Sequence, residues 1–135
     1  MFASSPTIIA YVVVMAVAAG STSRLKLANH EIATDPELRK NVATVLGRDY
    51  DGKTEIRHLL EILVRDVGLR KIARAVKHPL KGLKVVPYYG CLLSRPPEAT
   101  QFDDPENPTL MDQIMEAAGA TVVAWPHKTE CCGAG

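Results

Sequence analysis

Two short apolar runs, each followed by cysteine, constrain the fold of this chain more than any other feature. The first spans residues 83–88 and leads through Gly90 to Cys91, and the second spans residues 121–125 and leads to Cys131 and Cys132. Short valine-rich runs of this kind are typical of buried strands. Open α/β sheets place their ligand sites just beyond the ends of such strands. We therefore expect all three thiols to lie at one site.

A third apolar run, residues 7–19, predicts a further strand. It lies between Pro6 and Gly20, which makes it too short for the ~20 residues that cross a bilayer. An export signal is the alternative, but residues 1–6 contain no Lys or Arg. The β-branched residues at 11–14 favour a parallel strand that is buried on both faces.

Helical patterns fill the remaining sequence. The Asp35-Pro36 pair predicts a helix start and Gly47 its end. We expect further helices over residues 21–29, from Thr54 to Gly68, over 69–76, and from Thr109 to Gly119. The order of strand, several helices, strand, helix, strand predicts an α/β fold, a small parallel sheet with flanking helices.

Charge and cysteine content limit the function classes. The formal net charge is +1 over 135 residues, with basic and acidic side chains interleaved, so we expect no nucleic-acid partner. Three cysteines, two of them adjacent, make a poor disulfide framework for a secreted domain. We expect a reducing, cytoplasmic location in which the thiols serve metal or redox chemistry.

Cys91, Cys131 and Cys132 are the candidate metal ligands. Thiolates are soft ligands suited to an iron–sulfur or zinc centre, but three do not close a tetrahedral site. His127 is near enough in sequence to add a nitrogen ligand. Two other interpretations stay open: the cysteines are ordinary small residues without a ligand role, or the adjacent pair cycles between thiol and disulfide, although the common Cys-x-x-Cys redox spacing is absent.

The sequence around the thiols resembles one protein family. The runs YYGCLLSRP and KTECCGAG, with Cys91 and Cys131 40 positions apart (131 − 91), are similar to the cysteine-rich CCG module in the B subunit of heterodisulfide reductase and in related subunits. The upstream segments SRLKLANHE, DPELRKNV and YDGKTEIRHLLEIL are similar to the linker of that B subunit. The resemblance extends over nearly the whole chain from Ile9 onward.

This resemblance implies a function. In the family a lone cysteine, matched by Cys91, and a Cys-Cys-Gly pair, matched by Cys131 and Cys132, hold a noncubane [4Fe-4S] cluster at which a small-molecule disulfide is reductively cleaved. Tyr88 and its neighbours would shape the approach to the cluster. Electrons arrive through a ferredoxin-like iron-sulfur subunit and a flavoprotein, in a cytoplasmic complex that can associate with the membrane through its partners. In methanogens the substrate is the mixed disulfide of coenzymes M and B.

Two departures from the family pattern predict an incomplete module. The Cys-x-x-Cys that completes the second module is missing before Gly135, and that of the first module falls at Ala18 and Ser21. We expect residues 1–82 to hold the end of a first module plus a helical linker, and residues 83–135 the N-terminal part of a second. We expect the chain to be a central fragment of a longer subunit, or else a degenerate copy, and to be inactive alone. The alternative is a structural zinc-binding or protein-interaction module without catalysis.

Overall fold

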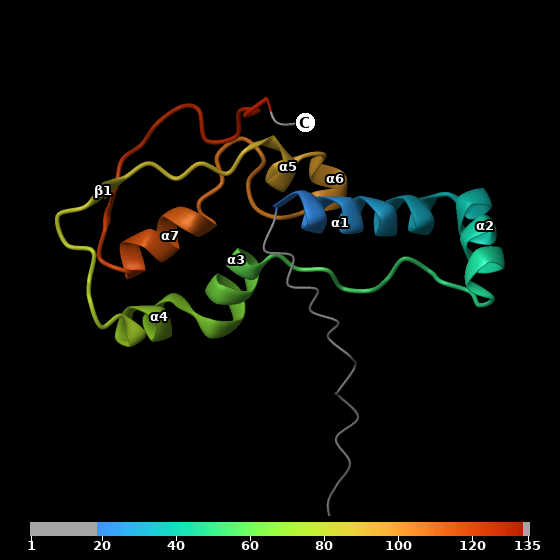
Figure 1. The fold of residues 1–135 in the computed structure, drawn as a ribbon, viewed down its shortest axis with the longest axis horizontal. Coiled ribbons are helices and arrows are strands. Elements are labelled where there is room, and N and C mark those ends of the chain that lie inside the picture. Colours follow the sequence, from blue (N-terminus) through green and yellow to red (C-terminus); the bar gives the residue numbers. More distant parts are fainter. Residues whose placement is uncertain (1–18, 134–135) are drawn as a thin grey trace, which may run out of the picture.

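The computed structural model describes residues 19–133, and the strand expected within residues 7–19 falls almost entirely outside this range. Helices dominate the described part, and the two strands that it contains lie at one end (Figure 1). The helices are α1 (Ala19–Thr34), α2 (Pro36–Leu46), α3 (Leu59–Ile62), the π-helical η1 (Leu63–Val67), α4 (Leu69–Ala75), α5 (Cys91–Ser94), α6 (Pro97–Thr100) and α7 (Leu110–Ala117).

The sheet consists of β1 (Lys84–Val85) and β2 (Thr121–Val122), which run parallel. Lys84 is paired with Thr121 and Val85 with Val122. The crossover between the strands includes α5, α6 and α7. The predicted class, helices flanking a small parallel sheet, is confirmed. The strands are shorter than expected, and Pro87, which has no N–H to donate, limits β1.

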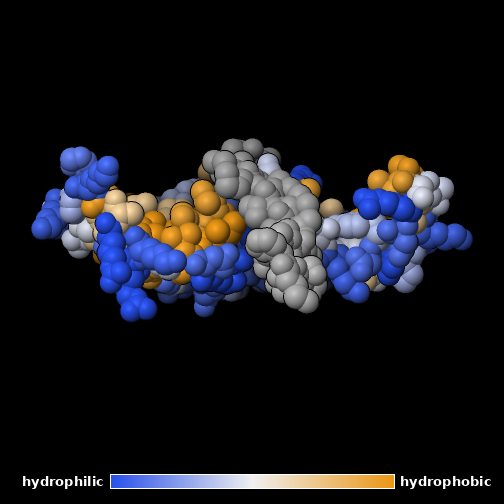
Figure 2. Space-filling view, turned by 90° about the horizontal axis from the view of Figure 1, so that it is seen from below, coloured by the Kyte–Doolittle hydropathy of each residue, from blue (hydrophilic) through white to orange (hydrophobic). Residues whose placement is uncertain are grey.

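The start and the end of α2 were predicted correctly from the residues at its two ends. The Asp35 carboxylate accepts hydrogen bonds from the N–H groups of Glu37 (2.8 Å) and Leu38 (3.0 Å), and Gly47 ends the helix with a positive φ of 67°. Two apolar side chains at the end of this helix are exposed, Val45 at 85% and Leu46 at 51%. Figure 2 shows apolar atoms at the end of the molecule formed by α2.

Two helix boundaries differ from the prediction. The first helix does not stop near residue 29 but continues as α1 to Thr34, because nothing at that point interrupts the backbone hydrogen bonds. The helix expected to begin at Thr54 begins instead after His58, whose Nδ1 accepts from the Leu60 N–H (3.2 Å). The Glu61 carboxylate returns a bond to the His58 N–H (2.8 Å), so the two residues form a capping box.

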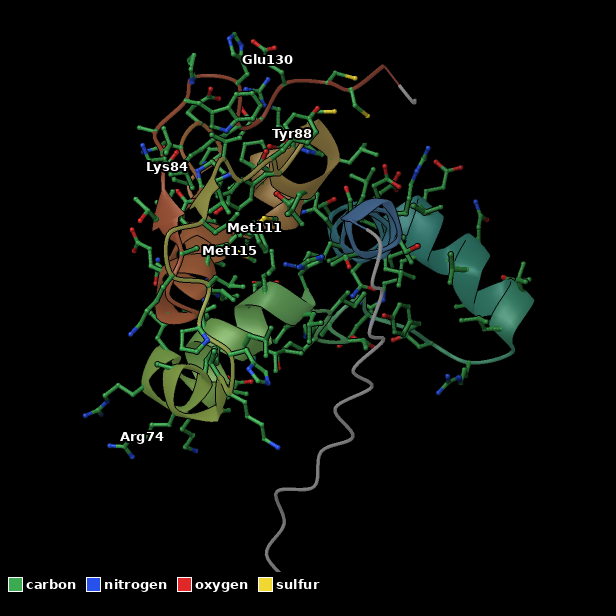
Figure 3. All side chains as sticks on the ribbon, turned by 60° about the vertical axis from the view of Figure 1, so that its left-hand side comes forward. Arg74, Lys84, Tyr88, Met111, Met115 and Glu130 are labelled. Atoms are coloured by element: carbon green, nitrogen blue, oxygen red, sulfur yellow. The ribbon has the colours of Figure 1, made fainter. Side chains whose placement is uncertain are left out.

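The core lies between α7, α3 and the turn that precedes α5. Its buried members are Tyr89, Leu93, Phe102 and Leu110, and Leu60, Val64 and Met111 pack against them. Figure 3 shows Met111 and Met115 on α7 on the side that faces the green helices. Since Tyr89 and Leu93 lie on either side of Cys91, packing fixes the segment that contains this cysteine from both directions.

Candidate functional site

The candidate site lies beyond the C-terminal ends of the two strands. The Thr121 N–H donates to the Leu83 carbonyl (2.8 Å) and the Val123 N–H to the Val85 carbonyl (2.9 Å). Both chain segments then leave the same edge of the sheet and enter the two cysteine-bearing loops. This placement agrees with the expectation that parallel strands deliver both loops to one edge.

Cys91 is the first residue of α5, and a glycine turn sets its direction. Gly90 has φ +72°, a backbone conformation that side-chain-bearing residues rarely adopt. The Cys91 carbonyl accepts from the Arg95 N–H (3.0 Å), which closes the single turn of α5, and the Cys91 side chain is half-buried. The thiol is thereby held at the start of a short, packed helix.

Cys131 and Cys132 lie in an exposed loop near the end of the described chain. The Gly133 N–H donates to the Cys131 Sγ at 3.4 Å, with Gly133 at φ +76°. The Tyr88 hydroxyl donates to the Glu130 carbonyl (2.6 Å) and ties this loop to the segment before Cys91. Figure 3 shows Tyr88 and Glu130 at the same end of the molecule.

The loops bring the thiols together. The pKa of the Cys91 thiol is raised, first because it hydrogen-bonds with the Cys131 thiol and then by burial and by the charge of Cys131. The pKa of Tyr88 is also raised, by burial and then by the nearby charges of Cys132, Cys131 and Cys91. Cys91 and Cys131 are therefore in contact, and all three cysteines lie near enough to Tyr88 to affect its pKa.

His127 is occupied by other contacts. Its Nδ1 lies 2.5 Å from the Glu130 Oε1, and its ring stands edge-on to Trp125 with 5.7 Å between centroids. Trp125 in turn contacts Tyr88 and donates from its Nε1 to the Pro87 carbonyl (2.8 Å). The aromatic residues thus form a row along the rim of the thiol site.

The three thiols have the chemistry that a soft metal centre requires, but they are too few to complete its ligand set. Sulfur ligands suit iron–sulfur and zinc centres, and two of the three sulfurs are in contact. Within residues 19–133, however, no three or more His, Cys, Asp or Glu side chains form a group able to hold a metal ion. Of the two positions at which we expect the first module's Cys-x-x-Cys from the sequence, Ser21 is exposed in the first turn of α1 and Ala18 lies outside the described residues. The site therefore supplies part of a ligand set.

Two polar residues at the site were not anticipated from the sequence. Lys128 is only 8% exposed, and its ammonium group pairs with the Asp112 carboxylate on α7. The sequence gives only a weak indication of this pair. A buried tyrosine such as Tyr89 needs a hydrogen-bond partner for its hydroxyl, and Asp112 is that partner at 2.8 Å. Lys128 begins the run KTECCGAG, but the run itself does not predict that this lysine is buried against Asp112.

Among helices in the described segment, none is both long and apolar enough to cross a membrane. No protein-family model matches the chain. It is 37% identical over 125 residues to the B subunit of the ferredoxin:CoB-CoM heterodisulfide reductase of Methanosarcina mazei, a match that covers 90% of this chain and 41% of the relative. The chain thus spans less than half the length of that relative.

Two further relatives extend the comparison. A protein of Archaeoglobus profundus that is described as similar to the heterodisulfide reductase B subunit is 35% identical over 116 residues, 82% of this chain and 39% of the relative. The "8-methylmenaquinol:fumarate reductase membrane anchor subunit" of Wolinella succinogenes is 33% identical over 116 residues, 84% of this chain and 40% of the relative. Matches of this extent necessarily include the segment around Cys91 and most of the helices before it.

Proposed function

Because the chain is homologous to the B subunits of heterodisulfide reductases, we propose that it is part of the iron–sulfur subunit of a disulfide-reducing complex. The observation that carries this proposal is the contact between Cys91 and Cys131, which come from two loops at one edge of a parallel sheet, with Cys132 next to Cys131 in the chain. Thiolates arranged in this way are suited to an iron–sulfur centre.

The chain's own residues prepare the ligands. The Gly133 N–H donates a hydrogen bond to the Cys131 sulfur, which orients this side chain in the exposed loop. The contact with Cys131 raises the pKa of the Cys91 thiol, so metal binding at Cys91 must release a proton. The Tyr88 hydroxyl donates a hydrogen bond to the Glu130 carbonyl, which ties the exposed loop to the segment before Cys91.

The proposed ligand set is larger than the three thiols of the described residues. A noncubane [4Fe-4S] cluster, held by Cys91, Cys131, Cys132 and ligands from outside the described residues, would carry electrons to the disulfide substrate. The CoB–CoM heterodisulfide or an analogue is the proposed substrate, and a ferredoxin-like subunit and a flavoprotein are the proposed partners. We assign residues 1–82 to the end of a first module plus a linker, residues 83–135 to the start of a second, and the activity to the whole subunit.

Anaerobic reconstitution tests the proposal. The reduced chain is incubated with ferrous iron and sulfide, with a small thiol in excess to fill the open coordination position, and iron, acid-labile sulfide and visible absorption are measured. We expect substoichiometric iron and sulfide with a broad visible band, lost in Cys91→Ser and kept in the control Leu92→Ala. Leu92 is 52% exposed and adjoins the ligand without supplying a donor.

Two results would contradict the proposal. The first is iron and sulfide uptake that is the same in Cys91→Ser as in the parent chain. The second is tight zinc binding without visible absorption, particularly if His127→Gln weakens it. That second outcome would favour a structural zinc site in which the cysteines and His127 hold the fold together.

A further inference from the structure

The two thiol loops are joined directly by their backbones at Lys128. The Lys128 carbonyl accepts hydrogen bonds from the N–H groups of Tyr89 (2.8 Å) and Gly90 (3.1 Å). Gly90 immediately precedes Cys91, and Lys128 comes three positions before Cys131. Along the chain, these two bonds therefore lie closer to both thiols than any bond of the β1–β2 ladder does.

The Lys128 side chain anchors the same junction from the inside. Its Nζ pairs with the Asp112 carboxylate and donates to the Pro108 carbonyl (3.1 Å). It also lies 5.9 Å from the centroid of the Tyr89 ring. Because the side chain is buried, the loop cannot move outward without separating a desolvated ion pair.

Asp112 extends the anchor to the Cys91 side of the junction. Its second oxygen accepts from the Tyr89 hydroxyl (2.8 Å), and that hydroxyl accepts in turn from the N–H groups of Met111 (2.8 Å) and Asp112 (3.1 Å) at the start of α7. Tyr89 and Lys128 are thus held by one carboxylate. Each belongs to a different thiol loop, so the position of α7 fixes one loop relative to the other.

The outer connection is weaker than this inner one. Tyr88 reaches the Glu130 carbonyl with its hydroxyl, but Tyr88 is 41% exposed and its bond competes with water. Lys128 by contrast combines two backbone bonds with a buried, charged side chain. The inner connection is therefore the better candidate for control of the thiol separation.

From these contacts we infer that Lys128 is a positioning residue: through Asp112 it holds the Cys131 loop in register with the Tyr89–Gly90 turn, and so keeps the Cys91 and Cys131 thiols in contact. Lys128 itself touches neither thiol in this role. The inference concerns the reduced, metal-free chain and does not depend on which metal the thiols bind.

Thiol cross-linking measures this directly. A Cys132→Ser background leaves Cys91 and Cys131 as the two cysteines of the chain. Dibromobimane links two nearby thiols by displacing its two bromides, and peptide mapping identifies the linked pair. We expect rapid cross-linking in the Cys132→Ser background chain. In Lys128→Met we expect the cross-linking rate to be lower by roughly tenfold, which corresponds to the loss of one hydrogen bond to a charged group.

Matched variants separate positioning from folding. Lys84→Met removes an exposed lysine on β1 and should leave the cross-linking rate unchanged. Lys128→Arg keeps the positive charge beside Asp112 and should cross-link at most of the background rate. Lys128→Met with Asp112→Asn removes the unpaired buried carboxylate while keeping an acceptor for Tyr89. We expect the double variant to regain thermal stability but still to cross-link slowly.

The inference is overturned if Lys128→Met, folded by circular dichroism, cross-links Cys91 to Cys131 at the background rate. It is also overturned if the double variant recovers both stability and the cross-linking rate, since Lys128 would then act only on stability. If Lys128→Met alone does not fold, the double variant decides between these outcomes.

Discussion

Removing the buried carboxylate of Glu61 should destabilise the chain far more than removing an exposed charge. Glu61 is only 2% exposed. Its carboxylate accepts from the Lys26 Nζ at 3.0 Å and from the His58 N–H at 2.8 Å. Arg65 lies at 3.4 Å from the other oxygen. One side chain therefore joins α1 to the start of α3.

The magnitude follows from what Glu61→Ala leaves behind. Lys26, whose side chain is 12% exposed, would keep its bond to the Thr100 carbonyl (2.7 Å) but lose its counter-charge. Breaking a buried pair by removing one partner costs about 3–5 kcal/mol. Loss of the capping interaction at His58 adds roughly 1 kcal/mol. A single domain has only about 5–15 kcal/mol of stability, so a large share of it is at risk.

Urea unfolding followed by circular dichroism measures this effect. The matched control is Glu55→Gln, because Glu55 pairs with Arg57 at 3.6 Å while 58% exposed and should contribute less than about 1 kcal/mol. The double variant Lys26→Met with Glu61→Leu removes both charges together and should recover most of the stability. If Glu61→Ala shifts the midpoint no more than Glu55→Gln does, the assignment of Glu61 as a buried, charge-bearing link is wrong.

Two further predictions test the same region. Burial lowers the pKa of His58 from 6.5, with Glu61 opposing and Lys26 adding to the shift, so the unfolded chain takes up more protons and stability should fall as the pH drops below about 6.5. His58→Asn keeps a capping acceptor and should flatten that fall in melting temperature; an unchanged slope would contradict it. Gly52 has φ +72°, and a Cβ there would collide with the Asn29 carbonyl. Gly52→Ala should therefore cost about 1–3 kcal/mol in urea unfolding, whereas Gly47→Ala, with open space around it, should cost less.

The predictable parts of the fold are those whose chemistry is local. The α2 helix was placed at both ends because Asp35 caps its own helix and Gly47 supplies the left-handed residue that ends it. The α3 start was misplaced because the cap is His58, a residue type that seldom serves this purpose. His58 takes the position only because Glu61 bonds back to it and Phe102 packs edge-on against its ring at 5.5 Å.

The location of the thiol site could be predicted from the sequence, but the contacts that hold its two loops together could not. Parallel strands deliver their ends to the same edge, so two strand-like runs with cysteines after them were enough to bring Cys91 near Cys131. The Lys128–Asp112 pair joins positions 16 apart through the tertiary fold. Lys128 begins the run KTECCGAG, but that run does not identify Asp112 as its partner. Such contacts depend on packing that local patterns do not encode.

These contacts are needed because the sheet alone does not fix the distance between the Cys91 and Cys131 thiols. The ladder ends at Val85 and Val123, and Cys91 follows six positions after the first (91 − 85) and Cys131 eight after the second (131 − 123). At about 3.3 Å per extended residue, these connections could each reach roughly 20 Å or more, far beyond thiol contact. The hydrogen bonds at the Lys128 carbonyl lie much nearer to the thiols. Gly90, which donates one of them, is the residue before Cys91, and only two residues separate Lys128 from Cys131. A two-stranded sheet therefore suffices to choose the edge at which the thiols meet, while the inferred role of the buried Lys128–Asp112 anchor is to keep them in contact.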